Sequence, residues 1–142
     1  MRKSMIKLYL TSSCGSCRKA RKWLIDNQLE YQEINLATGL NRASLIEILS
    51  LTEGGTGDIL SVQSDLYKEL NLDFSKMRLE QFLKTIEAYP LLLKRPIIID
   101  ENNIQVGFNE DDIRKFLPRE FREIQRSGAY SVFLKQWLES LA

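Results

Sequence analysis

The chain has 142 residues, of which 44% are hydrophobic and 27% are charged, a composition typical of one globular domain with a substantial core. The net charge of +1 argues against wholesale disorder and against nucleic-acid binding driven by bulk charge. The absence of histidine excludes a Ser-His-Asp triad, a Cys-His pair and an imidazole ligand for a metal.

The first part of the chain predicts a β-α-β unit. Residues 6–10 alternate and are rich in strand-forming types, and residues 31–34 form a second short strand. Between them, Cys14 opens a helical pattern that runs to about Asn27. This order places the pair of Cys14 and Cys17 at the N-terminus of a helix that follows a strand.

The middle of the chain predicts an all-helical lobe without a strand. Asn41 is placed to cap one helix, and residues 52–57 hold three glycines and form a break. Two further helices follow at about 64–70 and 77–89, and a proline ends the second of them.

The sheet resumes after the lobe. Residues 95–100 predict a buried strand that begins at a proline, and residues 104–108 return as its hairpin partner. Asn109 and Asp112 then match a capping box that opens a helix reaching Leu117.

These elements predict an α/β fold, a thioredoxin-like mixed four-stranded sheet with a helical insertion. The expected domains are a redox domain of residues 1–38 plus 91–118, an inserted helical lobe of 39–90 and a helical tail of 119–142.

The tail carries a strong amphipathic stripe at helical spacing, formed by Tyr130, Phe133, Leu134, Trp137, Leu138 and Leu141. We expect this stripe to pack on the protein's own sheet. Weak docking that presents the chain end to a protease, and pairing with a second copy, remain open alternatives.

The dithiol is the feature most indicative of chemistry. A helix N-terminus and the four basic residues 18, 19, 21 and 22 favour a thiolate at Cys14, and Cys17 lies one turn on, where it can resolve an oxidised Cys14. The alternative, a pair of buried apolar cysteines, is disfavoured by this spacing after a strand. Zinc is disfavoured because two thiolates without imidazole fall short of a four-ligand site. The basic residues themselves match either a solvated helix face or a DNA contact.

Arg95 is the second candidate. In a thioredoxin-like fold the proline loop before the third strand approaches the dithiol, so an arginine there can hold an anion or an oxidised sulfur near Cys14. A salt bridge to an acidic neighbour is an equally good explanation of Arg95.

Four segments together resemble the Spx family, bacterial thiol-stress regulators built on the arsenate reductase (ArsC) fold. They are residues 10–21 (LTSSCGSCRKAR), 51–56 (LTEGGT), 94–100 (KRPIIID) and 105–119 (QVGFNEDDIRKFLPR), in the expected order.

The resemblance implies a redox-sensing regulator, not an enzyme, that binds the C-terminal domain of the RNA polymerase α subunit and redirects transcription under thiol stress. Cys14 and Cys17 match the redox switch, Gly55 matches a glycine of the α-subunit contact, and Arg95 matches the arginine associated with the oxidised form. Contact with promoter DNA within the polymerase complex, and control by the ClpXP protease with an adaptor, are also implied.

The sequence departs from arsenate reductases of this fold, which surround the nucleophilic cysteine with three arginines. Arg95 matches one, while Ser61 and Gly107 stand at the approximate places of the other two. Gln63 replaces a frequent arginine of the Spx family, and the tail beyond residue 119 does not follow the family pattern. The incomplete anion cradle argues against oxyanion reduction, so a glutaredoxin-like thiol oxidoreductase is the better alternative function.

Two cysteines are too few for a secreted disulfide scaffold, and no apolar run approaches the roughly 18 residues of a membrane span. We therefore expect a cytoplasmic protein without membrane contact, cofactor, metal or catalytic residue. Translation starting at Met1 and at Met5 are both compatible with the sequence.

Overall fold

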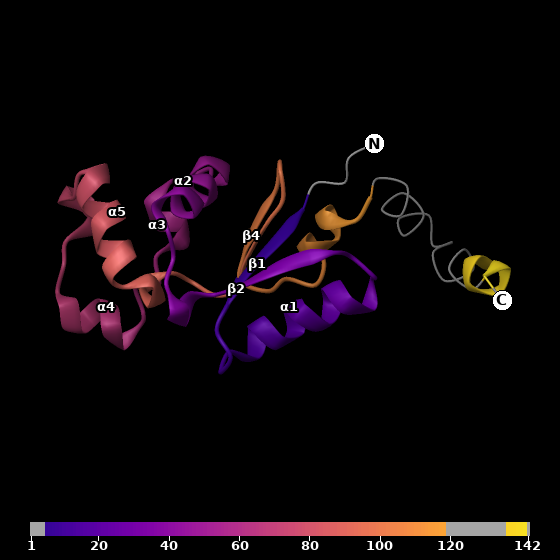
Figure 1. Ribbon diagram of the computed structural model, residues 1–142. Helices are drawn as coiled ribbons and strands as arrows, with labels where there is room; N and C mark the ends of the chain where they lie inside the picture. The colour runs from indigo at the N-terminus through magenta and orange to yellow at the C-terminus, as the bar shows by residue number, and fades with distance from the viewer. Residues whose placement is uncertain (1–4, 119–135, 142) are drawn as a thin grey trace. The chain divides into compact units, whose positions relative to one another are not determined.

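The computed structural model describes residues 5–118 and 136–141 (Figure 1). The chain forms two compact units, Met1–Phe108 and Asn109–Ala142. The first unit contains the whole sheet and the helical lobe. The predicted boundary between redox domain and lobe remains a prediction. Three of the six residues of the predicted tail stripe, Tyr130, Phe133 and Leu134, lie outside the described residues.

A mixed four-stranded sheet forms the centre of the first unit, which confirms the predicted fold class. Its strand order is β2-β1-β3-β4, with β1 parallel to β2 and antiparallel to β3, and with β3 antiparallel to β4. Tyr9 of β1 lies opposite Ile34 and Ile97, and Ile97 lies opposite Val106. The strands are β1 (Ile6–Leu10), β2 (Tyr31–Asn35), β3 (Ile97–Ile99) and β4 (Ile104–Val106).

The helices begin where the sequence offers capping side chains. Asn41 Oδ1 accepts the backbone N–H of Ser44 at 2.8 Å at the start of its helix, and the Ser64 hydroxyl accepts that of Tyr67 at 3.2 Å. The helices are α1 (Gly15–Asp26), α2 (Arg42–Leu51), α3 (Thr56–Ile59), α4 (Asp65–Leu70) and α5 (Leu79–Ala88). Short 3-10 helices lie at Leu36–Thr38, Phe74–Lys76 and Pro90–Leu92.

Two local predictions were wrong. The glycine-rich break ends early, because α3 starts within it at Thr56. The segment after Asn109 is a 3-10 helix, Asp112–Phe116, although Asn109 Oδ1 accepts the N–H of Asp112 at 2.8 Å as a cap should. With Pro118 so close, too few residues follow for a full α-helical ladder.

The lobe and the sheet share one hydrophobic core. Figure 1 shows α2 to α5 grouped on one side of the sheet, with α1 apart from them. The core joins Tyr9, Ile97 and Ile99 of the sheet to Leu45 and Ile48 of α2 and to Phe82, Leu83 and Ile86 of α5. Leu8 and Leu10 point to the opposite face of β1, because successive strand residues alternate. The buried residues of α1 (Cys17, Ala20 and Leu24) are not part of the shared core.

A short backbone link joins the lobe to the segment before β3. The Ser61 N–H donates to the Leu92 carbonyl and the Lys94 N–H donates to the Ile59 carbonyl, both at 2.8 Å, around an antiparallel bridge between Leu60 and Leu93. The bridge involves one residue on each side and is not a strand, so the described lobe contains helices only, as predicted.

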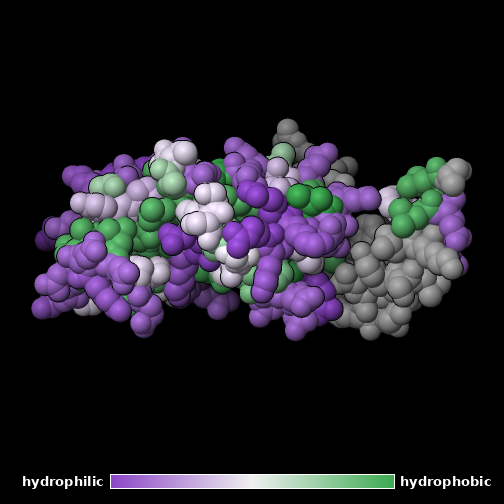
Figure 2. Space-filling view, turned by 90° about the horizontal axis from the view of Figure 1, so that it is seen from below, coloured by the Kyte–Doolittle hydropathy of each residue, from purple (hydrophilic) through white to green (hydrophobic). Residues whose placement is uncertain are grey.

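The face of the molecule in Figure 2 is mostly hydrophilic, with hydrophobic side chains showing between the polar ones over the α4–α5 end of the lobe. None of the described helices is both long enough and apolar enough to cross a membrane.

We expect the sheet and the lobe to unfold together, because they share the core that contains Phe82. Phe82 is 2% exposed and its ring meets that of Phe74 edge-on with centroids 5.9 Å apart, so Phe82→Ala should lower the free energy of unfolding by about 3–5 kcal/mol. Leu79→Ala on the same helix is the matched control, since Leu79 is 61% exposed, and should change it by less than about 0.5 kcal/mol. Urea unfolding measures both variants, followed by circular dichroism and by the fluorescence of Trp23 in a Trp137→Phe background. Separate transitions for the two signals would contradict the shared core.

Candidate functional site

The dithiol lies at the predicted place, the N-terminus of α1. Cys14 is the N-cap residue, with extended backbone angles, and its Sγ accepts the backbone N–H of Cys17 at 3.3 Å. Both cysteines are free thiols. Cys14 is half-buried and lines a pocket, whereas Cys17 is 1% exposed. The two sulfurs therefore differ in access, and a reagent in solution meets Cys14 first.

The two thiols also differ in their surroundings. Burial raises the pKa of the Cys17 thiol to about 11, and its hydrogen bond with Cys14 raises the pKa further, while the Thr11 backbone and the charge of Arg95 oppose the increase. Cys17 is thus a protonated, protected thiol at neutral pH. This is the arrangement expected of a resolving cysteine that acts after its neighbour has been oxidised.

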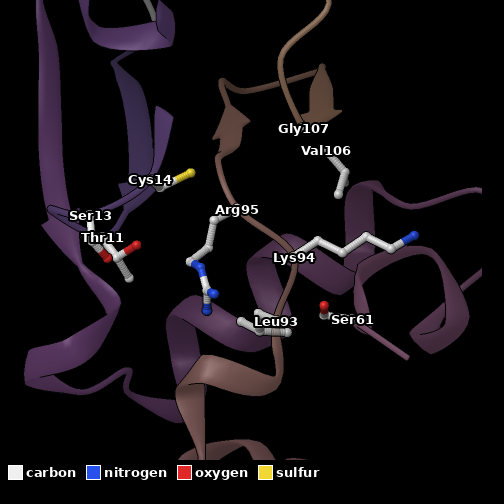
Figure 3. A pocket seen from close by; sticks show the side chains of 9 residues that line it. All are labelled: Thr11, Ser13, Cys14, Ser61, Leu93, Lys94, Arg95, Val106 and Gly107. Atoms are coloured by element: carbon white, nitrogen blue, oxygen red, sulfur yellow. The ribbon is translucent and has the colours of Figure 1, made fainter. Parts of the chain in front are cut away.

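A pocket of about 420 Å³ opens beside Cys14 (Figure 3). One wall comes from the turn after β1, and the other comes from the segment before β3 and from the end of the α3 segment. The lining residues are Thr11, Ser13, Cys14, Ser61, Leu93, Lys94, Arg95, Val106 and Gly107. The lining contains two cations and several hydroxyls but no carboxylate.

Arg95 lines this pocket, as predicted from its place before Pro96. Its side chain is half-buried and its Nη1 donates to the Leu91 carbonyl at 3.1 Å. The alternative of a salt bridge is not realised among the described residues, where Arg95 makes no ion pair. The structure therefore brings Cys14, Cys17 and an uncompensated arginine together.

Ser61 and Gly107 line the same pocket as Arg95. These are the positions at which the sequence lacks two of the three arginines of arsenate reductases. Neither residue can supply a positive charge, so the pocket has one guanidinium where an oxyanion cradle of that type has three.

Sequence reasoning did not single out Lys94, Thr11 and Ser13 as site residues. Lys94 is exposed, and its backbone N–H makes the hydrogen bond to the Ile59 carbonyl. Thr11 and Ser13 lie in the turn between β1 and α1. The polar turn before a helix was the available signal for Thr11 and Ser13. Lys94 had no such signal, because only the tertiary fold brings residue 94 to residue 14.

The basic residues of α1 divide into two kinds. Arg21 forms a bidentate pair with Glu33 at 2.7 and 2.9 Å, and Lys22 pairs with Asp26 at 2.6 Å. Arg18 and Lys19 are exposed and make no ion pair within the described chain. Half of this predicted cluster is therefore neutralised locally.

Gly55 lies outside the pocket, at the N-cap of α3, with φ 74° and ψ −141°. Glycine adopts this positive φ without the steric cost that a side chain brings, and the residue begins a helix here and does not end one. A Cβ at this position would meet no atom within 4 Å, so the surroundings of Gly55 are open. The neighbouring Gly54 N–H donates to Asp58 Oδ2 at 2.7 Å and closes the loop.

A metal site finds no support in the part of the chain that the structure describes: no group of three or more cysteine, aspartate or glutamate side chains there is placed to hold an ion.

Comparison with known proteins gives consistent matches. The model of the ArsC family matches residues 9–116. A protein named global transcriptional regulator Spx from Streptococcus pneumoniae is 50% identical over 120 residues, which are 84% of this chain and 90% of that protein. The Spx regulator of Streptococcus agalactiae is 46% identical over 84% of this chain and 88% of its own.

Solved structures share the fold at lower identity. An arsenate reductase from Vibrio cholerae has a TM-score of 0.69 and 22% identity, covering 82% of this chain and all of that one, 100%. An ArsC-family-related protein from Bacteroides fragilis has a TM-score of 0.69 and 24% identity over 81% of this chain and 99% of its own. These two likenesses concern the fold alone.

The difference in access between the two thiols predicts an order of modification. Under non-denaturing conditions iodoacetamide should label Cys14 at least about ten times faster than Cys17, because labelling of Cys17 needs a local opening. Diamide should give one intramolecular disulfide, detected by peptide mass spectrometry as the loss of two hydrogens. Intermolecular dimers as the main product, or equal labelling rates in the folded protein, would contradict this assignment.

The raised pKa of Cys17 predicts a loss of stability at high pH. Above pH 9 the unfolded chain releases the thiol proton that the folded protein keeps up to about pH 11, so ionisation favours unfolding in this interval. The free energy of unfolding of the reduced protein should therefore decrease by up to about 3 kcal/mol across it. Cys17→Ser lacks this titration and should show a flatter profile. Burial also raises the pKa of Tyr9, but that group is common to both proteins and cancels in the comparison.

Proposed function

This chain belongs to the ArsC family and, within it, to the Spx proteins, and we propose that it is a redox-gated regulator of transcription. The observation that carries the proposal is the asymmetric dithiol: an accessible Cys14 in a cationic pocket, with a buried Cys17 behind it. Relatives of nearly full length named as global transcriptional regulators support the same conclusion. On this proposal, formation of the Cys14–Cys17 disulfide switches the protein to its active form.

The proposed partner is the C-terminal domain of the RNA polymerase α subunit, which we place against the loop that contains Gly55. The open surroundings of Gly55 support this assignment, since a partner's backbone can approach a residue without a side chain. Gly55 lies at the opposite end of α3 from the pocket-lining Ser61, so the α-subunit contact and the dithiol are separate sites on one segment.

The proposal also includes a cytoplasmic location, contact with promoter DNA within the polymerase complex, and turnover by ClpXP with an adaptor. The segment in which a degradation signal is expected, after residue 119, lies largely outside the described residues.

A thiol oxidoreductase of ArsC or glutaredoxin type is the second candidate. The pocket beside Cys14, of about 420 Å³, is large enough for a small thiol substrate, so glutaredoxin-like activity is compatible with its size. The presence of Ser61 and Gly107 in place of arginines weighs against arsenate reduction. Assays of the purified protein with arsenate and with glutathione disulfide separate this candidate from a regulator without turnover.

Binding to the α-subunit domain is the central test of the proposed function. The affinity of the purified domain for the wild-type protein is measured by calorimetry, with the reduced and the oxidised protein side by side. We expect the wild-type protein to bind the domain and Gly55→Arg to abolish this binding. Because φ is positive at Gly55, any L-residue strains the backbone by about 1–3 kcal/mol. Gly55→Ala is therefore the matched control: it should share the small decrease in melting temperature but retain most of the affinity. Equal loss of binding in both variants would indicate backbone strain and not a contact.

Arg95 is expected to act in the oxidised, active form. Arg95→Ala should reduce stress-dependent transcription in a reconstituted system, while diamide still forms the disulfide. Lys94→Ala is the control for general positive charge, because Lys94 lines the same pocket from the next position in the chain. An equal effect of the two variants would show that charge alone matters.

A further inference from the structure

We propose that the pocket beside Cys14 selects its oxidant by charge, so that small disulfides carrying carboxylates react with Cys14 in preference to neutral or cationic ones. This inference rests on the proposed function in one respect, that Cys14 is the thiol that meets the oxidant. It adds the chemical class of molecule that the pocket admits.

The charge of the pocket is the first argument. Lys94 and Arg95 are its only charged lining residues, and neither forms an ion pair with any described residue. Arg95 Nη1 donates a hydrogen bond to the Leu91 carbonyl. This bond satisfies one N–H donor but leaves the positive charge of the guanidinium without a counter-ion. Some other cations of this unit are neutralised, as Lys7 is by Glu47 and Arg42 is by Glu80 and Glu87. What distinguishes Lys94 and Arg95 is that both line one pocket whose lining contains no carboxylate.

The start of α1 adds to this potential. Cys14 is the N-cap of a twelve-residue helix, and no acidic residue occupies the first turn. The Arg18 guanidinium folds back over this turn, with Nη2 3.7 Å from the position that a Cβ on Gly15 would occupy. The N-terminal end of α1 and the Arg18 charge near it therefore add to the positive potential that Lys94 and Arg95 produce in the pocket.

The form of the pocket favours a carboxylate over a compact tetrahedral oxyanion. With Ser61 and Gly107 in its walls, the pocket cannot surround an oxyanion with guanidinium groups. Figure 3 shows the Lys94 and Arg95 side chains leaving the backbone in different directions, so each cation serves its own part of the pocket. A flexible molecule with a carboxylate a few bonds from its sulfur needs only one such cation. The hydroxyls of Thr11, Ser13 and Ser61 supply further donors, and about 420 Å³ accommodates a small disulfide.

The reaction is a pair of thiol–disulfide exchanges. The Cys14 thiolate attacks one sulfur of R–S–S–R, a Cys14–S–S–R bond forms, and one R–S⁻ leaves. Cys17 then loses its proton and attacks the Cys14 sulfur, which forms the Cys14–Cys17 bond and releases the second R–S⁻. The two thiol protons are taken up by the two released thiolates or by solvent. The protein loses two electrons, and the small disulfide gains them.

The test uses three disulfides that differ in charge: dithiodipropionate is anionic, hydroxyethyl disulfide is neutral and cystamine is cationic. Each is reacted with full-length Cys17→Ser protein, in which the mixed disulfide on Cys14 accumulates and is counted by intact mass spectrometry. The rate at which each disulfide reacts with the protein is divided by the rate at which it reacts with a small neutral thiol. This ratio removes the differences in intrinsic reactivity among the three disulfides. At low ionic strength the normalised rate with the anionic reagent should exceed that with the neutral reagent by about 5-fold or more. The normalised rate with the cationic reagent should be lower than that with the neutral one by a similar factor. High salt should largely remove both differences.

Variants locate the effect. Lys94→Gln and Arg95→Gln should each reduce the anionic preference by about half or more, whereas Lys84→Gln on α5, an exposed lysine outside this pocket, should not change it. Lys94 is exposed, so its variant keeps the test valid even where Arg95→Gln fails to fold. Relative rates equal to those of the reference thiol, or an equal effect of Lys84→Gln, overturn the proposal. A protein that shows the preference but does not bind the α-subunit domain would refute the proposed function and leave this inference standing.

Discussion

The pairing of residues 59–61 with 92–94 is the constraint on which the site depends. Two backbone hydrogen bonds of 2.8 Å, on either side of the buried Leu60 and Leu93, fix the end of the α3 segment beside the segment that precedes β3 and carries Arg95. The antiparallel pairing of β3 with β1 brings Lys94 and Arg95 near Cys14, and the link adds Ser61 to the same pocket. Without this link, the pocket beside Cys14 would lack the part of its wall that Ser61 supplies.

The two faces of the sheet have different neighbours. The lobe covers the face of Tyr9, Ile97 and Ile99, and this shared core makes the segment before β3 rigid. The dithiol helix contributes no residue to that core, and the pocket beside Cys14 touches it only at Leu93 and at Val106 packed against it. Cys14 is therefore held by one element while the opposite side of its pocket is held by the shared core.

The predictions that succeeded depend on local signals. The helix starts at Asn41 and Ser64, and the position of Cys14 before α1, follow from capping side chains and from apolar spacing within a few residues. The short α3 escaped prediction because four residues display no periodicity, and the 3-10 helix after Asn109 was mistaken for an α-helix because the two share their capping chemistry. Lys94 was missed for a different reason, because pairing between distant segments of the chain forms the pocket. Only for Arg95, which precedes Pro96, did the expected thioredoxin-like fold predict a position near the dithiol.

The burial of Cys17 has a consequence for the return to the reduced state. A reductant reaches only the Cys14 sulfur of the disulfide, so the sulfur expelled from the bond is that of Cys17. Thiols of high pKa are poor leaving groups, and burial raises the pKa of Cys17 to about 11. On the proposed function, we expect reduction of this disulfide to be slower than that of one whose departing thiolate faces water. The burial that keeps Cys17 away from oxidants would then also lengthen the oxidised state, so that the packing around one sulfur atom contributes to the lifetime of the signal.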